Sequence, residues 1–281
     1  MVWLSTTVLA GCVAGAPYGC EPAPAREDDS YVSPVNAPDC RPNNDGVIER
    51  QEMPFVLGAV ARIRVGSGPM DVDVDGYVDE TGIRRWDFST PLPDSQPLAR
   101  LELQTLENQW FAPSFPQADY AGPLTPGGRL LGPLRIDDAG VHLLGSASAE
   151  QDPAEGRTLL VYDVPVTLYP YPLREDAHVT TTARASNAVL LGLTTALSDI
   201  YDVRVTGRGT LVLPDMILEN TLRVTVRLRR TLVAGDAQQV THVWVHECLG
   251  EVARVISPMG RLADTIPDSF TSAHEVWRLS L

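Results

Sequence analysis

The sequence predicts an all-β fold, a curved antiparallel sheet or a sandwich with little helix. Residues 222–229 alternate strictly between apolar side chains at even positions and Arg or Thr at odd positions, which is typical of a strand with one buried face. Residues 235–237 follow as a Gly-Asp-Ala turn, and residues 240–247 are the expected second strand of a hairpin. Because turn residues also separate the other apolar runs, an antiparallel sheet is favoured over βαβ units.

The other secondary-structure signals are shorter. Further strands are expected at residues 134–144, 158–168, 199–206 and 210–213. Helix is expected only as a turn or two near residues 52–60 and near residues 98–110. No internal repeat of fixed period is visible.

Composition and charge narrow the class of protein. The chain has 281 residues, of which 44% are hydrophobic and 21% charged, which is typical of a globular protein. It carries 36 acidic against 22 basic residues, a formal net charge of −14. This balance argues against nucleic acid as a partner, because phosphate binding needs a basic surface. It argues equally against adhesion to anionic lipid through the protein surface.

The first residues carry the strongest local signal. Residues 2–11 are uncharged and largely apolar, and they end in Leu-Ala-Gly before Cys12. This tetrapeptide resembles the lipobox of bacterial lipoproteins, in which the Cys is lipidated and the signal peptidase cuts before it. No Lys or Arg precedes the apolar run, which departs from the usual basic start of such a segment. We expect residues 1–11 to be a signal segment and Cys12 to carry a palmitate-containing membrane anchor.

Four sections are expected along the chain. After the signal segment, residues 12–38 are rich in Pro, Ala, Gly, Asp and Glu and are expected to be a flexible tether. An N-terminal section over residues 39–95 and an antiparallel β domain over residues 96–281 follow. This order places the chain in the cell envelope, on the outer membrane or the cell surface.

Three cysteines remain if Cys12 is lipidated, and an exported protein can form one bridge among them. A Cys40–Cys248 disulfide would tie the start of the domain to its last strands across a long loop. A Cys20–Cys40 disulfide would lie mostly within the tether. The first pairing is favoured, and the second stays open.

Residues 41–52 resemble an EF-hand calcium loop. Asn43, Asp45 and Glu52 fall at its third, fifth and twelfth positions, where calcium ligands are expected. The first position should be Asp, but it is Arg41. Bound Ca²⁺ and a plain Asn-Asp-Gly turn are therefore alternatives. Residues 71–76, Asp-Val-Asp-Val-Asp-Gly, show half of the same pattern, with a solvent-facing strand and turn as the alternative.

Signals of catalysis are weak, and the chain is not expected to be an enzyme. His242 and His246 lie on an expected strand, where four residues span roughly 13 Å, so the two imidazoles cannot share one metal ion. The sequence has no G-x-S-x-G nucleophile elbow and no glycine-rich phosphate loop.

Aromatic and basic side chains could also form binding surfaces. Four tryptophans that stand singly are expected to anchor the core rather than to line a ligand groove: Trp86, Trp110, Trp244 and Trp277. The arginines at the odd positions of 222–229 are expected to form a solvated strand face, with an acidic partner as the alternative.

A resemblance covers about residues 130–257. Residues 207–214 read G-R-G-T-L-V-L-P, and residues 219–224 read E-N-T-L-R-V. These segments resemble a "G-x-G-T-L-x-L-P … N-x-L-R-V" pattern of uncharacterised exported bacterial lipoproteins and sorting-domain proteins, as do the Tyr- and Pro-containing stretches 162–165 and 169–172. The resemblance implies an exported antiparallel β domain and no particular activity.

Together these signals predict an exported lipoprotein with a non-catalytic role in binding or envelope architecture. Its expected partner is the membrane, through the lipid anchor, while a protein or apolar ligand is left unidentified. The alternative is a carrier that holds a lipid or other apolar ligand in a half-open β fold. An interior apolar cavity of several hundred Å³ would favour the carrier.

Overall fold

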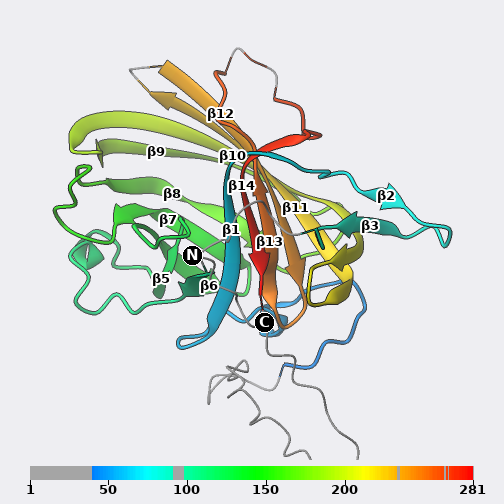
Figure 1. The fold of residues 1–281 in the computed structure, drawn as a ribbon. Helices are drawn as coiled ribbons and strands as arrows, with labels where there is room; N and C mark the ends of the chain where they lie inside the picture. Colours follow the sequence, from blue (N-terminus) through cyan, green and yellow to red (C-terminus); the bar gives the residue numbers. More distant parts are fainter. Residues whose placement is uncertain (1–39, 91–97, 233–234, 263, 265, 281) are drawn as a thin grey trace, which may run out of the picture. The chain divides into compact units, whose positions relative to one another are not determined.

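The computed structural model describes residues 40–90, 98–232, 235–262, 264 and 266–280, and every structural statement below concerns these residues. They belong to one compact unit. The fold is nearly all β, which confirms the predicted class (Figure 1). Cys12 and Cys20, and with them the expected signal segment and tether, lie outside the described residues.

Fourteen strands and two 3₁₀ turns make up the described part of the chain. They are η1 (Arg50–Glu52), β1 (Val60–Asp71), β2 (Tyr77–Val78), β3 (Arg84–Asp87), β4 (Leu98–Glu102), η2 (Ala112–Ser114), β5 (Tyr120–Pro123), β6 (Leu130–Asp137), β7 (Gly140–Ser148), β8 (Leu159–Pro170), β9 (His178–Leu190), β10 (Leu193–Val212), β11 (Ile217–Leu232), β12 (Gly235–His246), β13 (Gly250–Ile256) and β14 (Ser272–Leu279).

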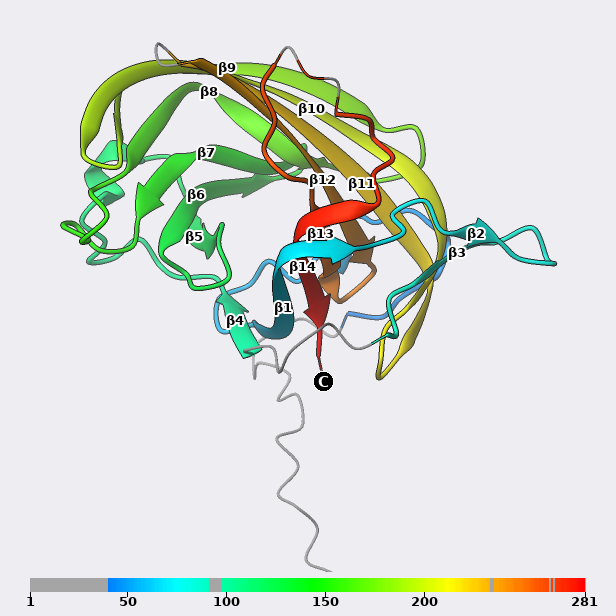
Figure 2. The ribbon, with the colours of Figure 1, turned by 45° about the horizontal axis from the view of Figure 1, so that its top comes forward.

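Twelve of these strands form one antiparallel sheet in the order β4-β1-β14-β13-β12-β11-β10-β9-β8-β7-β6-β5. The two ends of this order meet, because Gln104, just after β4, and Ala121 of β5 exchange N–H···O bonds of 2.8 and 2.9 Å. The sheet therefore curls into a nearly closed barrel, and its strands follow one another round the curve in Figure 2. Strand β2 pairs with β3, and β3 pairs in parallel with Gly209–Val212 of β10.

The inner face of the curved sheet holds the largest core. Buried side chains from the seven consecutive strands β6 to β12 form one cluster, as expected on the concave face of a curved sheet. Ile48 and Met53, from the chain before β1, fill the middle of this cluster. Its strand members are Leu134, Val141, Leu143, Val166, Tyr169, Ala183, Val203, Val205, Leu222, Val224, Val243 and Val245. Ile48 and Met53 therefore form part of the barrel's interior, whereas residues 49–51 between them are exposed.

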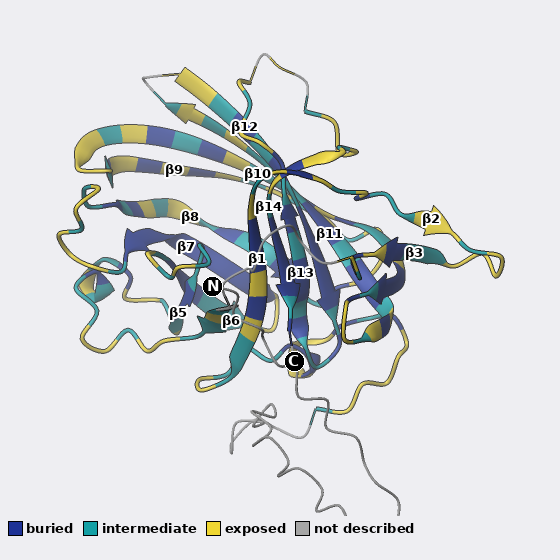
Figure 3. Cartoon of the chain, viewed as in Figure 1, coloured by how far each residue is buried: buried dark blue, intermediate teal, exposed yellow. Residues whose placement is uncertain are grey.

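A second core covers the outer face of strands β10 to β14. Trp244 points outward from β12, and Trp86 and Phe88 pack edge-on against it, with ring centroids 5.9 and 4.8 Å away. Figure 3 shows these central strands as largely buried. Trp86, Trp244 and Trp277 are at most 1% exposed, which confirms the prediction that they anchor the core, while Trp110 is half-buried.

The predicted alternation of residues 222–229 is confirmed, since Leu222 and Val224 are 0% exposed on the inner face. The prediction of a solvated arginine face is wrong for Arg223 and Arg227, whereas Arg229 is exposed as expected. Arg223 lies over the Trp86 ring and donates to the carbonyl of Val74, and Arg227 donates to the carbonyl of Ile266. The segments around Trp86 and Ile266 therefore contact the arginine side chains of β11. The alternation of residues within the strand could not predict these contacts, because they come from distant parts of the chain.

The helical turns differ in part from expectation. A helical turn was expected near residues 98–110, but Leu98–Glu102 form strand β4. Their backbone pairs with Val60–Arg64 of β1, so long-range hydrogen bonds override the local preference. The 39–95 section contributes β1 to the same sheet, between β4 and β14.

Candidate functional site

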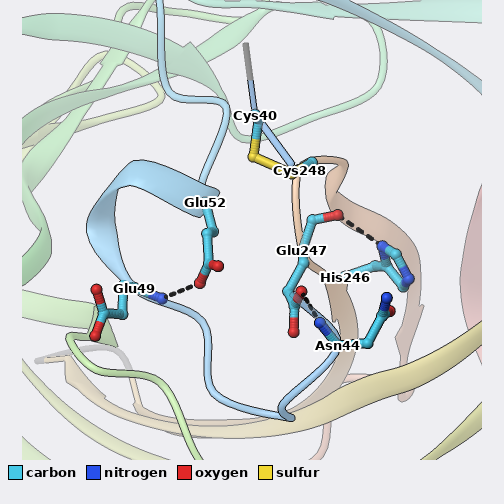
Figure 4. The surroundings of a disulfide bond; sticks show 7 residues. All are labelled: Cys40, Asn44, Glu49, Glu52, His246, Glu247 and Cys248. Carbon is cyan, nitrogen blue, oxygen red and sulfur yellow. Dashed lines mark hydrogen bonds between the residues drawn. A yellow bond between two sulfur atoms is a disulfide. The ribbon is translucent and has the colours of Figure 1, made fainter. Parts of the chain in front are cut away.

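A disulfide joins Cys40 to Cys248, with their Cα atoms 5.5 Å apart (Figure 4). Cys248 lies in the turn of residues 247–249 that connects β12 to β13. This is the first of the two pairings that the sequence suggested. The bridge ties the start of the described chain to the middle of the sheet.

The loop of residues 43–47 owes its shape to local hydrogen bonds. The side chain of Asn43 accepts from the Asp45 N–H at 2.9 Å, and that of Asp45 accepts from the Val47 N–H at 2.7 Å. Gly46 has φ +81°, a conformation that favours glycine. A Cβ there would also overlap the guanidinium of Arg208, which would have to move.

The loop is attached to the barrel at several points. Ile48 is 0% exposed and exchanges two N–H···O bonds of 2.8 Å with Leu173, which follows β8. Asn220 of β11 donates from its side-chain amide to the Asn44 carbonyl at 3.3 Å. The Cys248 N–H donates to the Glu52 carbonyl at 2.7 Å. The disulfide and these bonds together hold residues 44–52 against the end of the barrel.

Two carboxylates are buried where the loop meets the β12–β13 turn. Glu52 is 6% exposed and accepts from the Glu49 N–H at 2.9 Å. Glu247 is 2% exposed, and its Oε2 accepts from the Asn44 N–H at 2.8 Å. Its other oxygen, Oε1, is buried with no hydrogen-bond partner in the described structure. In Figure 4 both side chains lie between the loop and the turn.

Burial raises the pKa of Glu52, and its hydrogen bond from the Glu49 backbone opposes this effect. The negative charges of Glu247, Asp45 and Glu49 raise the pKa further. The carboxylates are therefore close enough to repel one another, and a positive charge placed among them would lower their energy.

The predicted ligands Asn43, Asp45 and Glu52 differ in their exposure to solvent. Asn43 and Asp45 are exposed, whereas Glu52 is buried. Among the described residues, no group of three or more His, Cys, Asp or Glu side chains is gathered as a ready metal site. The sequence analysis did not identify Glu247 as a site residue. The expected Cys40–Cys248 disulfide did offer a signal, because it places Cys248, the residue after Glu247, beside the loop.

The second acidic run forms a turn. Asp73 accepts from the N–H groups of Asp75 and Gly76 at 3.0 and 2.9 Å, and Val74 is 1% exposed. The two histidines of β12 have separate partners. His242 bonds to Thr225 and to the Asp268 carbonyl, and His246 bonds to the carbonyl of the next residue.

A half-open pocket of about 380 Å³ lies beside the loop. Its walls come from η1 and the residues after it, from β5 and β6, and from the turn after β8. Its lining is about equally polar and apolar: Met53, Phe55, Val56 and Ile136 are apolar, and Arg50, Gln51 and Asp119 are polar. Arg50 is paired with Asp138 at 2.6 Å. The Tyr171 hydroxyl is buried without a partner among the described residues, and burial raises its pKa.

Comparisons with known proteins leave the family open. No protein-family model, no curated protein and no solved structure matches the chain. In the part of the chain that the structure describes, no helix has the length and apolar character needed to cross a membrane.

Proposed function

We propose that this chain is an exported lipoprotein of the cell envelope that acts by binding rather than by catalysis. The observation that carries the proposal is the disulfide between Cys40 and Cys248. Disulfides persist in oxidising compartments and are rare in the cytosol, where thiols are kept reduced. The resemblance of residues 207–224 to exported proteins points in the same direction.

The position of the disulfide suits a domain that hangs from an anchor. Cys40 directly follows the proposed tether of residues 12–38. Any pull from a lipid on Cys12 would pass through the bridge to the turn between β12 and β13, two strands in the middle of the sheet. Residues 41–59, which fill one end of the barrel, would bear little of that load. The disulfide would thus protect residues 41–59 from mechanical load in a tethered protein, whereas a protein without a tether carries no such load.

The pocket beside η1 supports binding of a small ligand. Its volume falls within the range of small-molecule sites, which are mostly apolar with a few polar groups. Phe55, Tyr120 and Ile136 supply apolar surface, and Arg50, whose guanidinium is paired with Asp138, supplies hydrogen-bond donors. We infer a ligand with an apolar or aromatic body and an anionic or hydrogen-bonding group.

The carrier alternative requires a large apolar space inside the barrel. The inner face of β6 to β12 is instead packed around Ile48 and Met53. A filled interior favours the binding role, with the ligand at the edge of the barrel rather than within it. A carrier would hold stoichiometric lipid, which mass spectrometry of an organic extract of the purified protein would detect.

Metabolic labelling tests the anchor. The full chain is expressed in a bacterium fed labelled palmitate, and Cys12→Ser and Cys20→Ser are compared with the wild type. We expect label in the wild type and in Cys20→Ser and none in Cys12→Ser. Label that persists in Cys12→Ser, or a wild type that stays unlabelled, would contradict the proposed anchor.

A fluorescent probe tests the pocket. The dye 1-anilinonaphthalene-8-sulfonate has an aromatic body and an anionic group, so its fluorescence should rise saturably with the folded wild type. Ile136→Trp fills the pocket and should abolish the rise, while Ile200→Trp on the outside of β10 should leave it unchanged. Equal fluorescence in the two variants would exclude the pocket as the binding site.

A further inference from the structure

Glu247 and Glu52 are buried side by side without a balancing charge. Neither is paired with an Arg or His side chain in the described structure, and one oxygen of Glu247 has no partner at all. An ionised carboxylate out of contact with water and without a partner is costly, because its desolvation is not compensated. Such a group, facing an acidic loop, indicates a site for a cation.

The loop has the calcium-binding pattern except at its first position. Calcium takes six to eight oxygen ligands from carboxylates, amides and backbone carbonyls, and its loops begin with an Asp carboxylate. Arg41 stands at that position here. Glu247 meets the same loop from the β12–β13 turn, where its Oε2 already accepts the Asn44 N–H. The loop lacks the carboxylate expected at its first position, but the carboxylate of Glu247 contacts the loop from the β12–β13 turn.

We propose that residues 43–52 and Glu247 together bind a divalent cation of the calcium class. Glu247 replaces the carboxylate that the first position of the loop lacks. Asn43, Asp45 and Glu52 supply the remaining side-chain oxygens, and the Val47 carbonyl falls at the seventh position, where such loops use a backbone oxygen. This proposal is independent of the proposed function.

The separation of the ligands explains why they do not resemble a ready metal cluster. Asn43 and Asp45 are exposed, whereas Glu52 and Glu247 are buried. A cation would draw the loop and the β12–β13 turn together, reinforcing the link that the disulfide makes. Calcium is favoured over zinc because the donors are oxygens, whereas zinc sites mostly use Cys and His. The two cysteines at this place are already joined to each other.

Thermal melts and calorimetric titration of the full, disulfide-bonded chain test the site. A cation that binds only the folded state must raise the midpoint of unfolding. About 10 mM CaCl₂ should raise the midpoint by about 5 °C relative to EGTA, if the affinity is that of an extracellular calcium module. Titration should give saturable heat with one ion per chain. No shift and no heat at this concentration would overturn the proposal.

Three acid-to-amide variants identify the ligands. Glu247→Gln keeps an acceptor for the Asn44 N–H but removes the charge, and Asp45→Asn, at an exposed position, likewise keeps an acceptor for the Val47 N–H. Each should weaken calcium binding at least about 10-fold, because ligand charge sets affinity in such sites. Asp73→Asn, in the other acidic run, should bind calcium like the wild type.

The stability of Glu247→Gln without calcium separates a ligand from a structural residue. In EGTA the variant should melt at or above the wild-type temperature, because a buried unpaired charge has been removed. A purely structural Glu247 would lower the midpoint equally with and without calcium, and this result would overturn its assignment as a ligand. If Glu247→Gln does not fold, Asp45→Asn decides, and unchanged affinity in that variant contradicts the site.

Discussion

Arg230 donates two hydrogen bonds to the carboxylate of Asp199 inside the barrel, at 2.8 and 2.6 Å. Asp199 is 0% exposed, and the Tyr162 hydroxyl donates to the same carboxylate at 2.6 Å. The three residues come from β11, β10 and β8, so the contact from Tyr162 reaches across β9. Asp199 and Arg230 are opposite each other on paired strands, and the hydroxyl of Tyr162 links this pair to β8, a strand that does not pair with β10.

Removal of one charge from this pair should destabilise the fold strongly. Asp199→Asn leaves a buried guanidinium without its counterion, and we expect a loss of about 3 kcal/mol in the free energy of unfolding. Urea denaturation of Asp199→Asn, Arg230→Gln and the double variant measures the coupling. The double variant should lose less than the sum of the single variants.

The exposed pair of Arg50 and Asp138 provides the control, because its side chains are 51% and 95% exposed. Asp138→Asn should leave the urea midpoint unchanged, since exposed ion pairs contribute little. Simple additivity at Asp199 and Arg230 would show that the two residues act independently.

His242 should make stability fall as the pH falls below neutral. Burial, together with the positive charge of Arg223, lowers its pKa to about 4 from an ordinary value of 6.5. The Asp268 carbonyl can only accept, so Nε2 carries the proton and Nδ1 accepts from the Thr225 hydroxyl. This neutral form satisfies both neighbours, and protonation would leave Thr225 facing a second donor.

Between pH 6.5 and about 4 the unfolded chain binds a proton at His242 that the folded chain does not. Stability from this residue is therefore complete above pH 6.5 and is lost progressively down to about pH 4, by roughly 3 kcal/mol in all. Urea melts across this range should show the slope in the wild type and a smaller one in His242→Gln. An unchanged slope in His242→Gln would contradict the assignment.

Much of the sheet could be predicted because its signals are local. The alternation of Leu222 and Val224 with Arg223 depends only on residues next to one another. The turn expected at residues 235–237 was wrong in its position, because these residues already belong to β12 and pair with the end of β11. The resulting hairpin is the observed pairing of β11 with β12, in which Val224 lies opposite Val243. Antiparallel strands joined by short turns leave little freedom in register.

The parts that could not be predicted depend on contacts between distant residues. Closure of the barrel rests on Gln104 and Ala121, whose pairing has no pattern in the sequence. The contact of Arg223 with the Val74 carbonyl and that of Glu247 with the Asn44 N–H also join residues that are far apart in the sequence. For the candidate site, the loop was therefore recognisable, and the carboxylate that faces it was not.

Loss of the disulfide should weaken the fold globally and the loop locally. Cys40 and Cys248 are 208 residues apart, and cross-links that close long loops restrict the unfolded chain most. The double variant Cys40→Ser/Cys248→Ser should lose about 2–5 kcal/mol in the free energy of unfolding. Reduction of the wild type should reproduce the loss, and Cys20→Ser should not show it.

Hydrogen exchange would show where the effect of the disulfide is concentrated. The N–H groups of Asn44 and Val47, which bond to Glu247 and Asp45, should exchange faster in the double variant. The Val243 N–H in the middle of β12 should change only as much as global stability does. Uniform acceleration at all three sites would mean that the bridge does not hold the loop.

Two glycines with almost the same backbone angle separate conformational strain from crowding. Gly46 has φ +81° and Gly58 has φ +80°, so an alanine at either position pays the same penalty for left-handed backbone. Nothing lies within 4 Å of a Cβ at Gly58, whereas at Gly46 the Cβ would overlap the guanidinium of Arg208. In EGTA, Gly58→Ala should lower the free energy of unfolding by about 1 kcal/mol, and Gly46→Ala should lower it further. Because the added cost comes from displacing Arg208, the combination of Gly46→Ala with Arg208→Ala should recover part of it. If the two alanine variants melt alike, Arg208 is free to move and does not fix the loop.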